Sequence, residues 1–177
     1  MVREIKGKGP APVHLWNPPF CGDIDMLICR DGTWLHEGKP IRRPAMVKLF
    51  ASILKLEADG CYYLVTPVEK VRIKVADCPF VITAMTVSGV GQDQLIQFTT
   101  NTEESVDVNR DHPISIGSQL DDDEPHPTVE VREGLLGLLS RAVFYSLVEV
   151  AVEWKGKLGV WSGGVFFSFD PADRANS

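Results

Sequence analysis

Histidine and cysteine side chains are the first place to look for metal or acid–base chemistry, and this chain has four of each. The histidines are His14, His36, His112 and His126, and the cysteines are Cys21, Cys29, Cys61 and Cys78. None is spaced as H-x-x-x-H, H-E-x-x-H or C-x-x-C, the patterns that place two ligands on one metal ion. The acidic run at residues 121–124 lacks the central glycine and distal glutamate of a calcium-binding loop. The sequence therefore predicts no metal site and no metal cofactor.

Nucleophilic and nucleotide-binding motifs are equally weak. Cysteines 29 and 61 have histidines 36 and 112 as their nearest candidate bases, but both cysteines fall in strand patterns, where a thiol is usually a packing group. Ser162 precedes two glycines without forming the G-x-S-x-G elbow of serine hydrolases. Residues 89–91 lack the third glycine of a dinucleotide loop, and no phosphate-binding G-x-x-x-x-G-K-[ST] motif occurs. We therefore predict no catalytic residue and no cofactor.

Charged side chains next to the expected helices and strands are the strongest candidates for a binding site. They are Arg43, Arg72, Asp77, His112, Arg132 and Arg141. Guanidinium groups bind carboxylates and phosphates through paired hydrogen bonds, and helix N-termini favour anions. These residues define a candidate surface for a small anionic ligand or a protein partner. The alternative is structural: exposed ion pairs for the arginines, and a turn for the histidine.

Composition excludes several classes of function. The chain has 177 residues, is 44% hydrophobic and carries a net charge of −6. A globular fold is expected, whereas binding to nucleic acid or to an anionic membrane surface is not, because both require a clustered positive face. No apolar window reaches the ~20 residues of a membrane-spanning helix, and no secretory signal pattern opens the chain. We expect a cytoplasmic protein with free thiols.

Hydrophobic periodicity places these candidates on elements. In the first half, alternation predicts a strand over residues 24–28, Asp31-Gly32 predicts a hairpin turn, and residues 44–57 have the apolar stripe of a helix that begins at Pro44. Strands are expected at residues 61–66, 71–75 and 80–87. The tryptophans Trp34 and Trp161 occupy comparable hairpins and are interpreted as core, with a partner-binding rim as the alternative.

The second half repeats this order. Strands are expected at residues 95–100, 106–108, 114–116 and 128–132, with an acidic loop at 118–127 whose order the sequence leaves open. A helix is expected over residues 134–150, then strands at 158–161 and 165–169. The predicted fold class is α+β, with two similar small domains, each an antiparallel sheet packed on one helix. The expected boundaries are an extended arm at 1–22, domains at 23–87 and 88–170, and a tail at 171–177.

Several motifs together resemble a known family over roughly residues 15–170. They are C-G-D-I-D-M-L-I and R-D-G-T-W in the first half, and R-A-V-F-Y-S-L-V-E and G-V-W-S-G-G-V-F-F in the second. The set is similar to an uncharacterised bacterial family, the domain of unknown function 1285. That resemblance implies a two-domain α+β fold with internal repetition and a role in signalling, and it implies no enzymatic activity.

The function expected from these observations is a non-enzymatic regulatory or binding module, one that acts in bacterial signal transduction. The alternative is an anion-binding protein or an enzyme whose site lies in a cleft between the domains. A homodimer that closes an exposed patch on its symmetry mate is a third interpretation.

Overall fold

The computed structural model describes residues 10–119 and 122–170 and divides the chain into two compact units, Met1–Pro79 and Phe80–Ser177. None of the helices in these ranges is long and apolar enough to cross a lipid bilayer.

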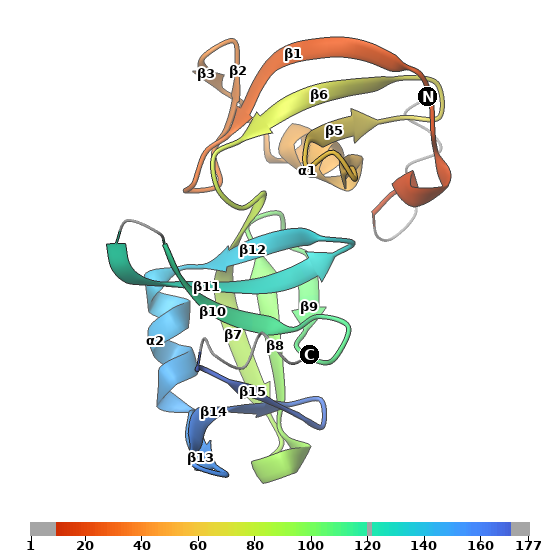
Figure 1. Cartoon of the computed structure of the whole chain (residues 1–177). Coiled ribbons are helices and arrows are strands. Elements are labelled where there is room, and N and C mark those ends of the chain that lie inside the picture. The colour runs from red at the N-terminus through yellow and green to blue at the C-terminus, as the bar shows by residue number, and fades with distance from the viewer. Residues whose placement is uncertain (1–9, 120–121, 171–177) are drawn as a thin grey trace. The chain divides into compact units, whose positions relative to one another are not determined.

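The first unit is a six-stranded sheet in the order β3-β2-β1-β6-β5-β4 (Figure 1). Its strands are β1 (Phe20–Ile28), β2 (Trp34–His36), β3 (Lys39–Pro40), β4 (Leu54–Leu56), β5 (Tyr62–Val65) and β6 (Lys70–Val75). Neighbouring strands are antiparallel except the central pair β1 and β6, which are parallel. A short 3₁₀ turn, η2 (Val13–Leu15), precedes the sheet.

The Asp31-Gly32 hairpin is confirmed. Thr33 donates its backbone N–H to Asp31 Oδ1 at 2.9 Å, and Gly32 has a φ of 92°, a conformation that glycine adopts without a steric penalty. The turn brings Trp34 opposite Ile28, and both side chains are buried. The hairpin therefore places both side chains in the core of the first unit.

Helix α1 (Pro44–Ser52) begins at Pro44, as predicted. The ring of Phe50 stacks on the buried Trp34 of β2, with 6.1 Å between ring centroids. The prediction that the helix extends to residue 57 was wrong. Residues 54–56 form β4 and pair with β5, because the alternating Leu-Lys-Leu pattern satisfies a strand edge better than another helical turn.

The second unit repeats the strand order of the first. Its six-stranded sheet has the order β10-β11-β12-β7-β8-β9, so the first and last strands of this sheet, β7 and β12, are again the central parallel pair. The strands are β7 (Phe80–Ser88), β8 (Leu95–Thr100), β9 (Ser105–Asp107), β10 (Ile114–Gln119), β11 (Asp122–Arg132) and β12 (Leu135–Leu139), with a 3₁₀ turn, η3 (Gly91–Asp93), between β7 and β8. The α+β fold with two similar units is therefore confirmed, with one parallel pair in each otherwise antiparallel sheet.

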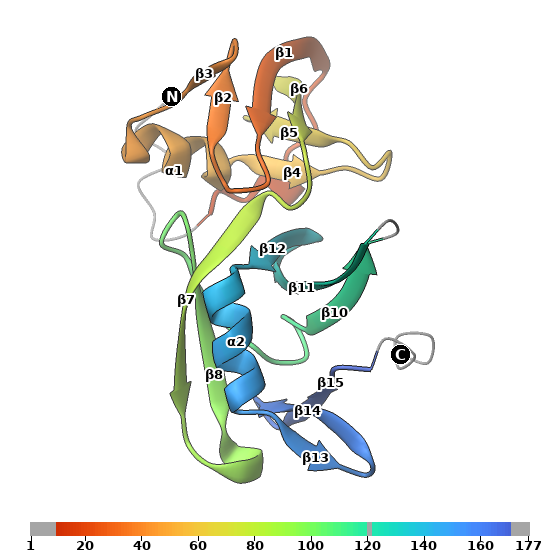
Figure 2. The same cartoon turned by 90° about the vertical axis from the view of Figure 1, so that its left-hand side faces the viewer.

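The helices do not share a position in this repeat. Helix α1 lies between the third and fourth strands of its unit, whereas α2 (Arg141–Glu149) follows the sixth strand of its own. It packs beside β7 (Figure 2) and leads into a separate three-stranded sheet of β13 (Val152–Trp154), β14 (Lys157–Ser162) and β15 (Val165–Ser168). The two units therefore repeat the six-stranded sheet but not the position of the helix.

The predicted helix over residues 134–150 was wrong in its first part. Residues 135–139 form β12, in which Leu135, Gly137 and Leu139 share one face, and the two leucines are buried. A Cβ on Gly137 would lie 2.8 Å from Ile82 Cδ1, so a larger residue here would require the Ile82 side chain to move. The helix begins after Ser140, whose Oγ accepts a hydrogen bond from the Val143 N–H at 3.3 Å.

The acidic segment at 118–127 was predicted as a loop, but β10 and β11 extend into it as a hairpin. Pro125 and Pro127 oppose Ser118 and Ile116, at positions where the β10–β11 ladder uses no N–H from β11, so this ladder tolerates them. Residues 120–121, together with the termini at 1–9 and 171–177, lie outside the described ranges.

The boundary between the two units falls between Pro79 and Phe80, whereas the first domain was expected to end at residue 87. The physical reason is β7, which pairs with β8 and β12 and so belongs to the second sheet.

Candidate functional site

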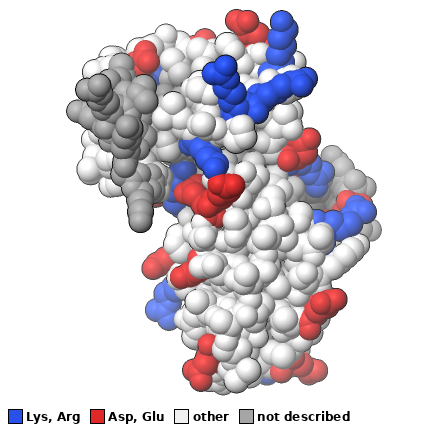
Figure 3. Space-filling view, turned by 180° about the vertical axis from the view of Figure 1, so that it is seen from behind, with Lys and Arg blue, Asp and Glu red and all other residues white. Residues whose placement is uncertain are grey.

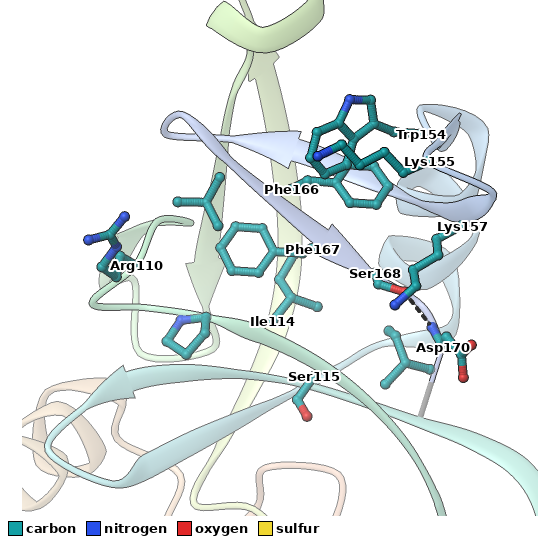
Figure 4. Close-up of a pocket in the computed structure, with 13 residues that line it drawn as sticks. Arg110, Ile114, Ser115, Trp154, Lys155, Lys157, Phe166, Phe167, Ser168 and Asp170 are labelled. Carbon is teal, nitrogen blue, oxygen red and sulfur yellow. Dashed lines mark hydrogen bonds between the residues drawn. The ribbon is translucent and has the colours of Figure 1, made fainter. Parts of the chain in front are cut away.

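A groove of about 850 Å³ lies in the second unit, between the six-stranded sheet and the three-stranded sheet (Figure 4). Strand β10 supplies one wall with residues 114–116, and β15 supplies the other with residues 165–168. The end of the groove is formed by the β13–β14 hairpin, which contributes Trp154, Lys155 and Lys157. Its volume falls within the range of ~300–1,000 Å³ that is common for ligand pockets.

Aromatic rings give the groove its apolar character. Trp154, Trp161 and Phe166 form a cluster with ring centroids 4.9–5.4 Å apart. Trp161 and Phe166 are directly opposite each other on β14 and β15, which is why their rings meet. Phe167, buried to 9% exposure, points from β15 towards Ile114 of β10 (Figure 4). A ligand in this groove would therefore contact aromatic and aliphatic carbon from both walls.

Basic side chains surround this apolar surface. Arg110 lies on one side in Figure 4, and Lys155 and Lys157 lie on the other; among the described residues, the lining contains one carboxylate, Asp170. Lys155 occupies a two-residue turn with Gly156, both with positive φ, and its Nζ lies 4.4 Å from the centroid of the Trp154 ring. The cation and the ring are held together before any ligand arrives.

Buried hydrogen bonds hold the three-stranded sheet against the larger one. Ser162 is fully buried, donates its hydroxyl to Val108 O at 2.6 Å and accepts the Ile96 N–H at 2.9 Å. Gln94 contacts the end of β14 and the turn after it. Its side-chain Nε2 donates to Trp161 O at 2.9 Å, and its backbone carbonyl accepts the Gly163 N–H at 3.1 Å. These contacts define the distance between the two sheets and hence the groove.

Metal ligands do not gather in this groove. Within each unit taken by itself, the described residues contain no group of three or more His, Cys, Asp or Glu side chains close enough to share an ion. The expectation that the chain binds no metal stays a prediction.

Comparison with known proteins identifies the family. The model of the DUF1285 N-terminal domain matches residues 11–78, and the model of the DUF1285 C-terminal domain matches residues 79–169. The chain belongs to the DUF1285 family. Both matched regions are described as being of unknown function, and no curated protein matches the chain. The resemblance seen in the sequence is thus confirmed.

Two solved structures are similar to this DUF1285 protein. A DUF1285 family protein from Silicibacter pomeroyi DSS-3 is 50% identical, with a TM-score of 0.89, and the match covers 99% of this chain and 95% of that chain. A second DUF1285 family protein, from Shewanella baltica OS155, is 29% identical with a TM-score of 0.54, covering 70% of this chain and 90% of that chain. These matches support the fold and the family and assign no function.

Three of the predicted site residues lie in the first unit of the DUF1285 chain. Arg43 is exposed at the N-terminus of α1. Arg72, on β6, makes two hydrogen bonds to Asp23 at 2.5 and 2.9 Å, which lowers the pKa of that carboxyl group and raises the pKa of the guanidinium. Asp77 lies 3.3 Å from Arg30 Nε. Arg72 and Asp77 each pair with a different residue of opposite charge, which fits the interpretation of an ion-paired surface.

The other three lie in the second unit. His112 Nδ1 is 3.0 Å from the carbonyl oxygen of Glu130, within a turn closed by its own backbone. Arg132 is largely buried, pairs with Glu104 at 3.1 Å and lies over the Phe80 ring at 5.3 Å. Arg141 is exposed at the first turn of α2. None of the six predicted residues is among those that line the groove.

The groove residues were missed because they follow no catalytic or metal-binding pattern. One residue did point towards the groove. The alternative interpretation of Trp161 is a partner-binding rim, and Trp161 lies in the aromatic cluster beside the groove. The Trp-Lys-Gly-Lys run at 154–157 is a second signal, because a two-residue turn presents an aromatic and two cations together. The contribution of β10, distant in sequence, had no local signal.

Proposed function

We propose that this DUF1285 protein is a cytoplasmic, non-enzymatic binding module, and that the groove of its second unit takes an anionic partner with an apolar part. The observation that carries the proposal is the coincidence of an aromatic cluster with three basic side chains around one groove. The aromatic rings favour burial of the apolar part of the ligand, and the cations favour a carboxylate, sulfonate or phosphate group on it.

The residue types in the lining favour binding over catalysis. Among its described residues, the lining has neither a histidine nor a cysteine, the side chains that most often transfer protons or attack substrates near neutral pH. Ser168 is engaged with the backbone, since its Oγ accepts the Asp170 N–H at 3.0 Å. A signalling role follows if the bound partner is a regulatory component of the cell.

Charge elsewhere on the protein fits a local anion site. On the face drawn in Figure 3, Lys and Arg gather at the upper right, over the first unit, while Asp and Glu are scattered. With a net charge of −6, the whole molecule repels anions at long range, so recognition has to come from short-range contacts with particular cations. Nucleic acid, which needs an extended basic face, is a poor candidate.

The test is a fluorescence titration with 1-anilinonaphthalene-8-sulfonate, which joins an aromatic body to one sulfonate. We expect saturable binding to the folded protein, and the doubly substituted Lys155→Ala/Lys157→Ala variant should bind roughly 3- to 10-fold more weakly, the range expected for two exposed charge contacts. Trp154→Ala should also weaken binding. The uncharged N-phenyl-1-naphthylamine should bind more weakly than the sulfonate and lose little in the double variant.

The matched control is Lys39→Ala, which removes an exposed lysine from β3 in the first unit. Near-ultraviolet circular dichroism checks that the dye does not report a loosened fold. Equal affinity of the sulfonate for the wild type, the double variant and Trp154→Ala would refute the proposal.

A further inference from the structure

The two walls of the groove are the outer edges of two sheets. Strand β10 is at one end of the order β10-β11-β12-β7-β8-β9, and β15 is at one end of the order β13-β14-β15. Each therefore pairs with a neighbour on one side only within the described ranges. An edge strand presents a row of N–H and C=O groups that can pair with another extended chain.

The direction of the free groups on β15 follows from its register. Phe169 donates its N–H to Leu158 O at 2.8 Å across β14, and Val160 is opposite Phe167. Because backbone groups alternate along a strand, Val165 and Phe167 point towards β14, and Phe166 and Ser168 point their N–H and C=O groups away from it. Both Phe166 and Ser168 line the groove.

The same argument applies to β10. Glu130 of β11 donates its N–H to Pro113 O at 3.1 Å, and Ser115 is opposite Thr128. Ile114 and Ile116 consequently point their backbone groups away from β11, and both line the groove. The Ile114 side chain is buried at 7% exposure, which makes this wall apolar.

Side chains at the groove match an extended acidic segment. A strand added to β15 alternates its side chains between two faces, and β15 carries Phe166 on one face and Phe167 on the other (Figure 4). Apolar side chains on one face of the added strand would meet the ring on that face. Its carboxylates would meet basic side chains, because the described residues of the lining include Arg110, Lys155 and Lys157 and one carboxylate, Asp170.

We infer that the groove binds an acidic segment of a protein partner as an extended strand that pairs with the open edge of β15. The inference rests on the proposed function and names the class of its ligand. Such pairing uses main-chain hydrogen bonds for affinity and side-chain pockets for specificity.

The experiment uses the full chain and a capped octapeptide of alternating glutamate and valine, followed by calorimetry. Two further versions carry N-methyl groups, either on all valine amides or on all glutamate amides. In an extended strand one series of N–H groups faces β15 and the other faces away, so one methylated peptide should lose about tenfold or more in affinity and the other much less. A lysine–valine octapeptide of the same length should not bind.

A protein variant tests the edge from the other side. Ser168→Pro removes an outward N–H that the β14 ladder does not use, and we expect it to weaken peptide binding more than Ser168→Ala, which keeps that N–H. The methylated peptides keep the test decisive if Ser168→Pro does not fold.

The two proposals fail in different ways. Binding of the sulfonate dye with no binding of the peptide, or equal affinity for all three glutamate peptides, would overturn strand addition and leave the anion-binding groove. Absence of both dye and peptide binding would overturn both. Concentration-dependent self-association that excludes the peptide would also overturn the inference, because the edge would then be covered by a second copy.

Discussion

Tyr63 and Asp59 show how a single hydrogen-bonded pair can shift the pKa values of two side chains in the first unit. The Tyr63 hydroxyl donates to Asp59 Oδ2 at 2.6 Å, and Oδ1 of the same carboxylate accepts the Cys61 N–H at 2.9 Å. These bonds favour the carboxylate and the protonated phenol, so the pKa of Asp59 is lowered and the pKa of Tyr63 is raised to about 12. Sequence reasoning singled out neither residue.

Asp59→Asn should return the pKa of Tyr63 towards the ordinary value of ~10, because the amide no longer stabilises the protonated phenol through a charge. Tyrosinate absorbance, read immediately after a jump to alkaline pH and before unfolding, measures it. Tyr63→Phe identifies the signal, and Asp107→Asn, in the second unit, is the control. A wild-type Tyr63 that ionises near pH 10 would contradict the expectation.

The sign of the pH effect on stability follows from the same shifts. Asp59, with a lowered pKa, stabilises the fold above its ordinary pKa of ~3.9, and this contribution is lost as the pH falls through the folded value. Tyr63 contributes below ~10, and that contribution is lost as the pH rises towards 12. The stability of Asp59→Asn should therefore depend less on pH at both ends.

Helix α2 illustrates the scale of an element, because its start was misplaced in the sequence analysis. Residues 135–139 have apolar side chains at spacings that suit either a helix or a strand, and Ser140 separates β12 from α2. Periodicity alone does not decide between the two for a short apolar run. The parallel partner β7, 57 residues earlier in the chain, decided it.

Ser140→Ala should lower the free energy of unfolding by ~0.5–2 kcal/mol, the usual cost of losing an N-cap. Chemical denaturation monitored by far-ultraviolet circular dichroism measures the change. Ser146→Ala is the matched control, since Ser146 is exposed within α2 and its hydroxyl only returns to the Ala142 carbonyl. Equal losses in the two variants would show that Ser140 does not act as a cap.

Ser162 connects β14 to the larger sheet and so maintains the groove. Replacing it by alanine leaves the buried Ile96 N–H and Val108 O without this partner, at a cost of ~1–3 kcal/mol for each unsatisfied group. Ser162→Ala should therefore unfold at lower denaturant concentration and bind the sulfonate dye more weakly. Ser105→Ala, exposed on β9, is the control; unchanged stability of Ser162→Ala would refute this assignment.

At the scale of the whole molecule, the chain consists of two compact units whose six-stranded sheets have the same strand order. In each six-stranded sheet the first and last strands form a central parallel pair, so each of these sheets closes through contacts between its own ends. Closure between distant segments is slow, because loop entropy is lost before the strands pair.

Trp34→Ala should cost ~3–5 kcal/mol, since the indole is 1% exposed and stacks on Phe50. Hydrogen exchange of the full chain, followed by mass spectrometry, should show faster exchange in β1, β2 and β6 than in the sheet of the second unit. Ser162→Ala should give the opposite pattern. A uniform increase across both units in either variant would contradict separate cores.

The sequence by itself determined the class of fold, the Asp31-Gly32 hairpin, the start of α1 and the family. These depend on local turn chemistry, on apolar periodicity and on motifs contiguous in the chain. Only the tertiary structure decided that residues 135–139 are a strand, that the repeat is one of sheets, and that β10 and β15 form the walls of one groove. Pairing between distant strands is a long-range choice, and a short apolar segment carries no local record of which partner it will meet.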